Sequence, residues 1–326
     1  MVNNTKATVF FYIFLIILSG CNKKPENFTS TESPNYLHED NEVPDNKMFD
    51  IDIQDFQEIS MQRSYDFLQK GRYQGSDNPL ISYHFLSPNK VEYSAHYSYY
   101  ENPPRVITKS GIYGIHEDNG VPFLNIRWDN NETEKYLMLI GDHVLFLYNG
   151  DGEPAYSFRY YPPDSDSEGD RYFSHIEPMR DITASSSLVD GGIAYTPDKI
   201  GLKINSVWAE GANGHGIHEK LFMPKPTLSD ELYLSIGYVA YSKPYLYREN
   251  SRPRRIRVSM GGEANYKDIE LDDTPNFQTI NLSDIDIVQR DIPVDEWQIQ
   301  IEILDVYPGT KYEDTCINAL LFRWSQ

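Results

Sequence analysis

Trp297-Gln298-Ile299-Gln300-Ile301-Glu302-Ile303 alternates apolar and polar side chains without interruption. Successive side chains of a β-strand point to opposite faces of a sheet, so the stretch predicts a strand with one buried and one solvated face. Two sheets that bury such faces against each other form a β-sandwich. We therefore expect a β-sandwich towards the end of the chain.

Similar short runs rich in β-branched and aromatic residues lie on both sides of this stretch, and such residues suit a pleated sheet. The strands predicted for this part of the chain are residues 203–208, 231–238, 255–260, 267–271, 277–282, 297–306 and 315–324.

The first half of the chain predicts a second β-structure, an antiparallel meander. Its predicted strands are residues 80–86, 91–98, 111–116, 121–128, 134–140, 143–148 and 155–160, after one short helix between Ser60 and Gly71. Turn residues such as Asp118-Asn119-Gly120 separate them. A meander hides its edges most simply by closing into a small barrel, and a lipocalin-like arrangement is expected. The interior of such a barrel either holds a small ligand or is filled by side chains. Because no polar residue recurs on the inward-facing positions, we expect a filled interior.

The fold class that follows is all-β, with an N-terminal meander or small barrel and a C-terminal jelly-roll β-sandwich. About 280 residues exceed what one core usually organises, which favours two domains. Residues 162–170 are polar and acidic with two prolines, as in a linker. The expected divisions are a signal peptide at 1–20, a disordered tether at 21–46, a β domain at 47–161, a linker at 162–181 and the sandwich at 182–326.

The chain begins with features of an exported lipoprotein. Residues 8–18 are uncharged and mostly apolar, but the run is too short to cross a bilayer, as in a signal peptide. Leu18-Ser19-Gly20-Cys21 resembles the lipobox of bacterial lipoproteins. The resemblance implies that the Cys21 sulfur takes a diacylglycerol, with acyl chains such as palmitate, and that the chain is then cleaved before Cys21. The expected location is therefore the cell envelope, anchored by lipid to a bacterial membrane at its periplasmic face or surface. The alternatives are an ordinary secretory signal with a chance cysteine, or a buried N-terminal strand.

Composition excludes several classes of function. The formal net charge of −20, from 49 acidic and 29 basic residues, repels polyanions, so nucleic acid is excluded as a partner. With Cys21 acylated, Cys316 has no partner for a disulfide, and its apolar strand predicts a buried packing residue. There is no Gly-x-Ser-x-Gly elbow and no phosphate-cradling glycine loop, so the sequence indicates no cofactor and no nucleophilic enzyme. It gives no oligomeric state.

A more specific pattern lies in the second half. The run from Trp208 to Glu219 combines a tryptophan, a glycine-rich loop and two carboxylates, and Gly237-Tyr238, Asn250-Ser251-Arg252 and residues 305–317 follow it. Together these resemble a discoidin-related, galactose-binding-like β-sandwich known as the NADase-type glycan-binding domain, over residues 182–326. The resemblance implies an eight-stranded jelly roll and carbohydrate recognition, and it does not imply catalysis. No part of the chain resembles the NAD-hydrolysing module that accompanies this domain elsewhere.

One departure from the family's pattern concerns the glycine-rich loop. The family tends to have Gly-Ile-Gly-Glu, where this chain has Gly216-Ile217-His218-Glu219. A side chain at position 218 restricts a loop in which glycine's conformational freedom is useful.

A sugar site needs a flat aromatic face and planar polar groups that bridge neighbouring hydroxyls. The candidates for the aromatic face are Trp208, Tyr238, Tyr307 and Tyr312. The candidates for the polar groups are Glu210, His215, His218, Glu219, Asn250, Arg252 and Asp314. Each also has a structural alternative. Trp208 suits core packing, Asn250 and Arg252 suit a tie between loop and sheet, and Tyr307-Pro308-Gly309 suits a tight turn.

Two other interpretations of the same loop are weaker. His215, His218 and Glu219 are of zinc-ligand type, but the helical His-Glu-x-x-His arrangement is absent and flanking glycines indicate a loop, so no metal is predicted. Glu210 and Glu219 lie in one loop, whereas a glycosidase draws its acid and base from facing strands, so no catalytic residue is predicted. The leading hypothesis is a lipid-anchored lipoprotein that binds glycan or a glycosylated partner. The alternative is an envelope protein-interaction or structural lipoprotein without a sugar site.

Overall fold

The structure is a computed structural model that describes residues 62–69, 72–74, 80–97, 105–142, 144–161, 176–226, 229–285 and 297–323. The predicted signal peptide, Cys21, the tether and residues 162–175 of the predicted linker lie outside the described residues. Within the described ranges, no helix combines the length and the apolar character needed to cross a membrane.

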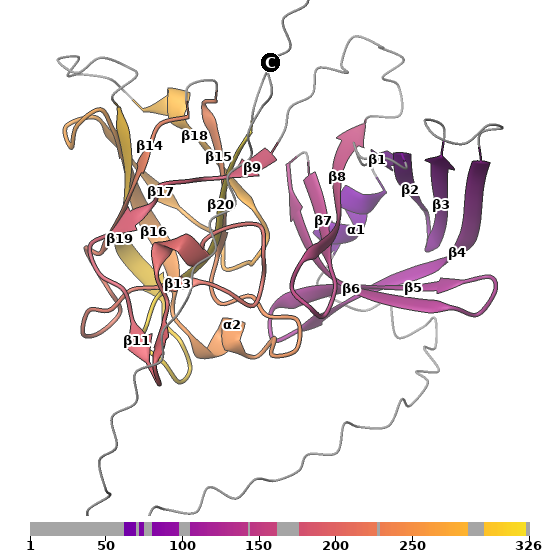
Figure 1. Ribbon diagram of the computed structural model, residues 1–326, viewed down its shortest axis with the longest axis horizontal. Helices are drawn as coiled ribbons and strands as arrows, with labels where there is room; N and C mark the ends of the chain where they lie inside the picture. Colours follow the sequence, from indigo (N-terminus) through magenta and orange to yellow (C-terminus); the bar gives the residue numbers. More distant parts are fainter. Residues whose placement is uncertain are drawn as a thin grey trace, which may run out of the picture. The chain divides into compact units, whose positions relative to one another are not determined.

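The N-terminal half is an antiparallel barrel that follows helix α1 (Gln62–Leu68). Its strands are β1 (Arg72–Gln74), β2 (Leu80–Leu86), β3 (Lys90–Tyr97), β4 (Arg105–Asp118), β5 (Val121–Trp128), β6 (Thr133–Gly141), β7 (Val144–Tyr148) and β8 (Pro154–Tyr161). Each strand pairs with the next, and β1 pairs with β8 to close the order. These strands run from indigo to magenta in Figure 1. The predicted meander and its closure are confirmed.

Turn chemistry sets the pairing of the strands. Asn119 and Gly120, between β4 and β5, have φ values of 52° and 86°, the conformation of a two-residue hairpin turn that Asn-Gly adopts readily. The turn places Asp118 opposite Val121 and fixes the register of both strands. Alternate residues of the hairpin consequently face the barrel interior.

The C-terminal half is a sandwich of two antiparallel sheets (Figure 1). One sheet has the order β10 (Thr183–Ala184), β14 (Lys220–Pro224), β19 (Gln298–Tyr307), β16 (Arg252–Met260) and β17 (Tyr266–Glu270). The other has the order β13 (Trp208–Ala209), β20 (Cys316–Arg323), β15 (Glu231–Ile236) and β18 (Gln278–Asn281), and β9 (Ile176–Pro178) also pairs with β20. A hairpin of β11 (Val189–Asp190) and β12 (Ile193–Ala194), and helices η3 (Pro197–Lys199), α2 (Leu246–Glu249) and η4 (Leu282–Asp284), complete it.

The alternating stretch behaves as predicted. In β19, Ile299, Ile301 and Ile303 are buried, and the intervening polar residues are exposed or half-buried. Their buried side chains meet Leu234 and Leu320 of the opposite sheet in one apolar cluster. The all-β prediction with a C-terminal sandwich is confirmed.

The local predictions need several corrections, and the two-residue strands β10, β11 and β12 were not predicted. The strand predicted at residues 203–208 is reduced to β13, because Asn205 has a φ of 68° and breaks the extended backbone. Strand β14 was not predicted, because its five residues are bounded by Pro224 and show little alternation. Strand β1, with three residues, is also too short for a pattern. Strand β9 lies inside the predicted linker, so the sandwich begins before residue 182.

Two apolar clusters fill the barrel and the sandwich, and a third joins them. The joining cluster includes Phe123 and Phe146 of the barrel with Tyr233 and Phe277 of the sandwich. The Phe277 N–H donates a hydrogen bond to the Ile140 carbonyl at 2.8 Å. The barrel and the sandwich therefore share buried surface within one compact unit, residues 51–326.

Candidate functional site

Glu210 holds the glycine-rich loop against the start of β20. One of its carboxylate oxygens accepts the Ala212 N–H at 2.7 Å, and the other accepts the Thr315 N–H at 3.2 Å. Gly216, at a φ of 63°, packs on this carboxylate, and a Cβ there would lie 2.3 Å from Glu210 Cγ. Burial raises the pKa of Glu210, although the hydrogen bonds from Thr315 and Ala212 act in the opposite direction. Glu210 is fully buried and shapes the loop from within.

Ser251 ties three loops together beside Glu210. Its hydroxyl accepts the Gly309 N–H at 3.0 Å and lies 3.0 Å from Nδ1 of His215. The Thr315 hydroxyl donates to the His215 carbonyl at 2.8 Å. His215 thus serves to fix the loop between Glu210 and β20.

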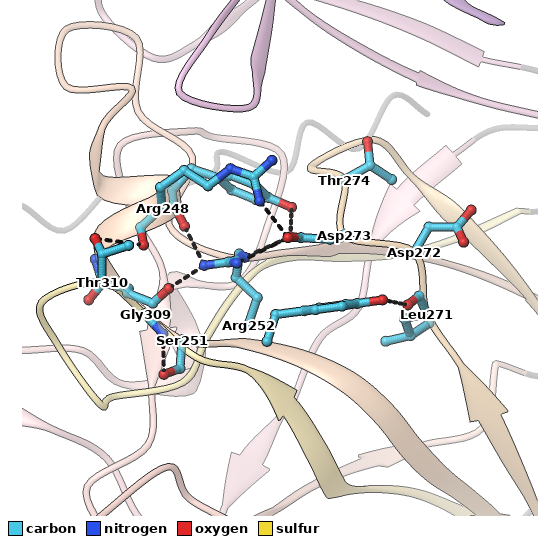
Figure 2. A network of polar contacts seen from close by, with 12 residues as sticks. Arg248, Ser251, Arg252, Leu271, Asp272, Asp273, Thr274, Gly309 and Thr310 are labelled. Atoms are coloured by element: carbon cyan, nitrogen blue, oxygen red, sulfur yellow. Dashed lines mark hydrogen bonds and ion pairs between the residues drawn. The ribbon is translucent and has the colours of Figure 1, made fainter. Parts of the chain in front are cut away.

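A buried charge network lies next to Ser251 (Figure 2). The Arg252 guanidinium donates to both carboxylate oxygens of Asp273, at 2.8 and 3.1 Å, and to the carbonyls of Asn250 and Tyr247 at 2.7 and 3.1 Å. Arg248 donates to the same carboxylate. Burial acts to raise the pKa of Asp273, but the bonds and charges of Arg252 and Arg248 outweigh it and lower that pKa.

In this network, the candidates Asn250 and Arg252 have a structural role instead of facing a ligand. Asn250 is buried and donates to the Leu246 carbonyl at 2.9 Å at the end of α2. Arg252 has only 5% of its side chain exposed. The Asn250 side chain caps the end of α2, the Arg252 side chain connects α2 and its loop to the sheet, and both side chains are buried.

Trp208 and Tyr307 also act in packing and backbone support. Trp208 is fully buried in the sandwich core, and its indole N–H donates to the Ser186 carbonyl at 3.0 Å. The Tyr307 hydroxyl donates to the Leu271 carbonyl at 2.8 Å. The ring of Trp208 therefore has no open face for a sugar.

His218 and Glu219 lie at the edge of the loop. His218 has a φ of 73°, and its Nδ1 lies 2.8 Å from Oε1 of Glu302. The carboxylate of Glu219 accepts hydrogen bonds from the hydroxyls of Ser185 and Ser186. The positive φ confirms that position 218 has a backbone conformation that favours glycine.

Three remaining candidates come together in what we term the tyrosine–carboxyl cluster, with two residues that sequence reasoning missed. The cluster consists of Asp190, Tyr195, Tyr238, Tyr312 and Asp314. The rings of Tyr195 and Tyr238 meet edge to face with centroids 6.3 Å apart. Burial raises the pKa of Tyr195, and the nearby Asp190 and Asp314 carboxyls raise it further. Burial, then the charge of Asp190, likewise raises the pKa of Asp314.

The cluster is open to solvent. Tyr312 is 39% exposed, Asp190 is exposed, and Tyr195, Tyr238 and Asp314 are half-buried. The Asp314 carbonyl accepts the Ser251 N–H at 3.1 Å, so the loop-tying contacts also position this carboxyl. Aromatic rings and carboxylate acceptors are therefore presented together on a supported surface.

The signal that sequence reasoning missed is the glycine pair that follows Asp190. Gly191 and Gly192 have φ values of 55° and 82° and form a two-residue hairpin turn between β11 and β12. The hairpin carries Asp190 on its first strand, and Tyr195 directly follows its second. A Gly-Gly turn predicts the hairpin itself. It does not predict the contact between Tyr195 and Tyr238, because these residues are far apart in the sequence.

Cys316 is a buried packing residue, in agreement with the prediction. It packs with Val207 and Ala209, and burial raises the pKa of its thiol. In the part of the chain that the structure describes, no group of three or more His, Cys, Asp or Glu side chains is placed to hold a metal ion.

The sandwich topology and its loop cluster can now be compared with known families. Residues 171–323 match the NAD glycohydrolase translocation F5/8 type C domain family. The match supports the discoidin-like resemblance of the C-terminal half and includes β9. We refer to this half as the F5/8 type C domain.

The other comparisons add little. No curated protein matches the sequence. Among solved structures, the chain is similar to the arabinofuranosyltransferase AftD from Mycobacteria, with 14% identity and a TM-score of 0.30, over 57% of this chain and 14% of that chain. At this TM-score the likeness bears on neither fold nor function.

Proposed function

We propose that this chain is a non-catalytic binding lipoprotein of a bacterial cell envelope, whose F5/8 type C domain recognises a glycan or a glycosylated partner. The observation that carries the proposal is the tyrosine–carboxyl cluster. The F5/8 type C match supports a discoidin-like binding domain around it.

The cluster has the chemistry that sugar binding requires. A pyranose ring places its C–H face on an aromatic ring, and its neighbouring hydroxyls donate to planar carboxylates. Tyr312 provides an exposed aromatic ring. Asp190 and Asp314 add carboxylate acceptors to the same surface, and the charge of Asp190 contributes to the raised pKa of Asp314.

The buried candidates support this surface indirectly. The Glu210 carboxylate accepts the Thr315 N–H, the Ser251 N–H donates to the Asp314 carbonyl, and the Ser251 hydroxyl contacts the His215 ring. These hydrogen bonds fix the loops that carry Asp314 and His215. A site whose loops are held before the ligand arrives loses less entropy on binding. Glu210 and Ser251 are therefore positioning residues in this proposal.

The test is a glycan array followed by titration calorimetry with the complete chain. We expect Tyr312→Ala and Asp314→Asn each to weaken binding of a glycan hit about tenfold or more, while the thermal midpoint stays close to that of the wild type. Tyr266→Ala and Asp268→Asn are the matched controls, because Tyr266 is 47% exposed and both residues contact Arg257 on β16 instead. Absence of glycan binding by the wild-type chain, or equal losses in the controls, contradicts the proposal.

A protein partner is the second candidate. Val189 and Ile193, on the hairpin that carries Asp190, are 68% and 58% exposed. Exposed aliphatic side chains next to a polar cluster suit a protein interface. A single stoichiometric partner, captured by the chain and unaffected by competing sugars, would favour this function.

Lipid anchoring at Cys21 rests on the sequence pattern alone. Mass spectrometry of the mature protein tests it independently of ligand binding. We expect an N-terminal peptide that begins at an acylated Cys21. A mature chain that begins elsewhere contradicts the anchor and leaves the proposed ligand site untouched.

A further inference from the structure

One end of the barrel interior is lined by aromatic side chains from five strands, which we term the aromatic cage. The cage consists of Tyr83 on β2, Tyr93 on β3, Trp128 on β5, Tyr136 on β6 and Tyr156 on β8. Tyr83 meets Tyr93 edge to face at 5.1 Å and Tyr156 at 5.8 Å, and Trp128 meets Tyr93 edge to face at 6.1 Å. Trp128 and Tyr83 are buried, whereas Tyr93 and Tyr156 are half-buried, so solvent reaches the cage.

A cation of the chain itself lies over this cage. The Lys109 ammonium is 5.4 Å from the centroid of Trp128 and 6.0 Å from that of Tyr93. It also lies 3.5 Å from the carboxylate of Glu132 and 3.8 Å from that of Glu134. Lys109 is 34% exposed, so its long side chain can move aside into water.

The charged residues are part of the barrel lining. Lys109 lies on the same, inward-facing side of β4 as Tyr113 and Ile115. Glu134 lies on the inward-facing side of β6 with Tyr136 and Met138. The Tyr136 hydroxyl donates to the Glu134 carboxylate at 2.9 Å. The expectation of an inward phase without polar residues is therefore wrong at this end of the barrel.

The arrangement has the parts of a receptor for an organic cation. The faces of tryptophan and tyrosine attract a cation through their quadrupoles, and carboxylates beside them add countercharge. The Trp128 indole N–H is buried and has no hydrogen-bond partner among the described residues, and a ligand hydroxyl that reached it would satisfy this donor.

We propose that this end of the barrel binds a small quaternary ammonium compound that carries a hydroxyl group. Its cationic head would lie over Trp128 and Tyr93 and next to Glu134, in the place that the Lys109 ammonium occupies. The site belongs to the barrel and is independent of the proposed glycan site.

The test uses choline and its uncharged carbon analogue, 3,3-dimethyl-1-butanol, in titration calorimetry with the complete chain. The two probes have the same shape, and only choline is cationic. We expect choline to bind and the analogue not to bind. Because Lys109 competes for the same place, Lys109→Gln should tighten choline binding about tenfold, whereas Glu134→Gln should weaken it several-fold.

Lys311→Gln is the matched control, because the Lys311 ammonium also lies over a tyrosine, Tyr312, at 4.8 Å but far along the chain from the barrel. It should leave choline binding unchanged. Circular dichroism melting shows that each variant is folded. The proposal is overturned if neither the wild type nor Lys109→Gln binds choline, if the analogue binds equally well, or if Lys311→Gln has the effect expected of Lys109→Gln.

Discussion

The guanidinium of Arg252 and the carboxylate of Asp273 form a two-point ion pair, with N–O distances of 2.8 and 3.1 Å, beneath the loops of the F5/8 type C domain. Only 5% of the Arg252 side chain and 24% of the Asp273 side chain are exposed. The Tyr247 hydroxyl donates to the same carboxylate at 3.1 Å. A guanidinium buried to this extent depends on its countercharge.

We expect Asp273→Asn to destabilise the fold by about 3 kcal/mol at pH 7, because loss of one partner of a buried pair leaves the other charge uncompensated. The remaining exposure of Asp273 places the effect at the low end of the range for such pairs. Urea unfolding followed by circular dichroism measures it.

The control is an ion pair with the same geometry on the surface. Arg257 contacts both oxygens of Asp268 at 2.7 and 3.0 Å, but their side chains are 33% and 37% exposed. Asp268→Asn should cost at most about 1 kcal/mol. Equal losses in the two variants would show that burial does not govern the Arg252–Asp273 pair.

The same pair makes stability depend on pH. The pKa of Asp273 in the folded chain lies below its ordinary value of 3.8, so its contribution to stability is complete above that value. The contribution is lost as the pH falls through the folded-state pKa. The difference in unfolding free energy between wild type and Asp273→Asn should therefore be constant from pH 7 to 5 and narrow below pH 4. If the difference in unfolding free energy grew as the pH fell, the predicted direction of the pH dependence would be contradicted.

The glycine-rich loop gives a prediction in the opposite direction, towards greater stability. His218 has a φ of 73°, a conformation that glycine adopts without steric cost. We expect His218→Gly to raise the unfolding free energy by up to about 1 kcal/mol, because the His218 side chain is 73% exposed and its contact with Glu302 contributes little to stability. Thermal unfolding of the two chains measures the change.

His218→Ala separates backbone strain from the side-chain contact. Alanine removes the imidazole but keeps the steric cost of the positive φ, so it should bring no gain. If the unfolding free energy rose in both variants, the cause would be removal of the imidazole and not relief of backbone strain.

Much of the fold is predictable because it is encoded locally. The alternation at residues 297–303 predicts β19, and the Asn119-Gly120 turn predicts the β4–β5 hairpin. The incorrect strand predictions also have local causes. Asn205 interrupts the predicted strand at residues 203–208 with a positive φ, and the short β14 shows no clear period.

The candidate site was harder to predict because residue type does not reveal burial. Trp208 and Glu210 have the right chemistry for a sugar site, yet both are fully enclosed by contacts from distant segments. Tyr195 meets Tyr238 through a ring contact that is long-range in sequence, and Asp190 lies on the hairpin that leads into Tyr195. Sequence therefore locates the loops of the site, and tertiary contacts decide which of their side chains face solvent.

The last prediction concerns the contact between the barrel and the F5/8 type C domain. Phe277 packs against Phe146 of the barrel with ring centroids 5.2 Å apart, and its N–H bonds to the Ile140 carbonyl. Because this contact links two cores, we expect the wild-type chain to unfold in one cooperative calorimetric transition. Phe277→Ala should remove about 3 kcal/mol or more and separate the transition into two.

Phe85→Ala is the matched comparison, since Phe85 is equally buried but lies in the interior cluster of the barrel. Removing it should lower the stability of the barrel by a similar amount while leaving its contact with the sandwich intact. If the shared cluster couples the two cores, the ratio of calorimetric to van't Hoff enthalpy rises clearly above one only in Phe277→Ala. Two separate transitions in the wild-type chain would contradict the coupling, because the barrel and the sandwich would then unfold independently with Phe277 in place.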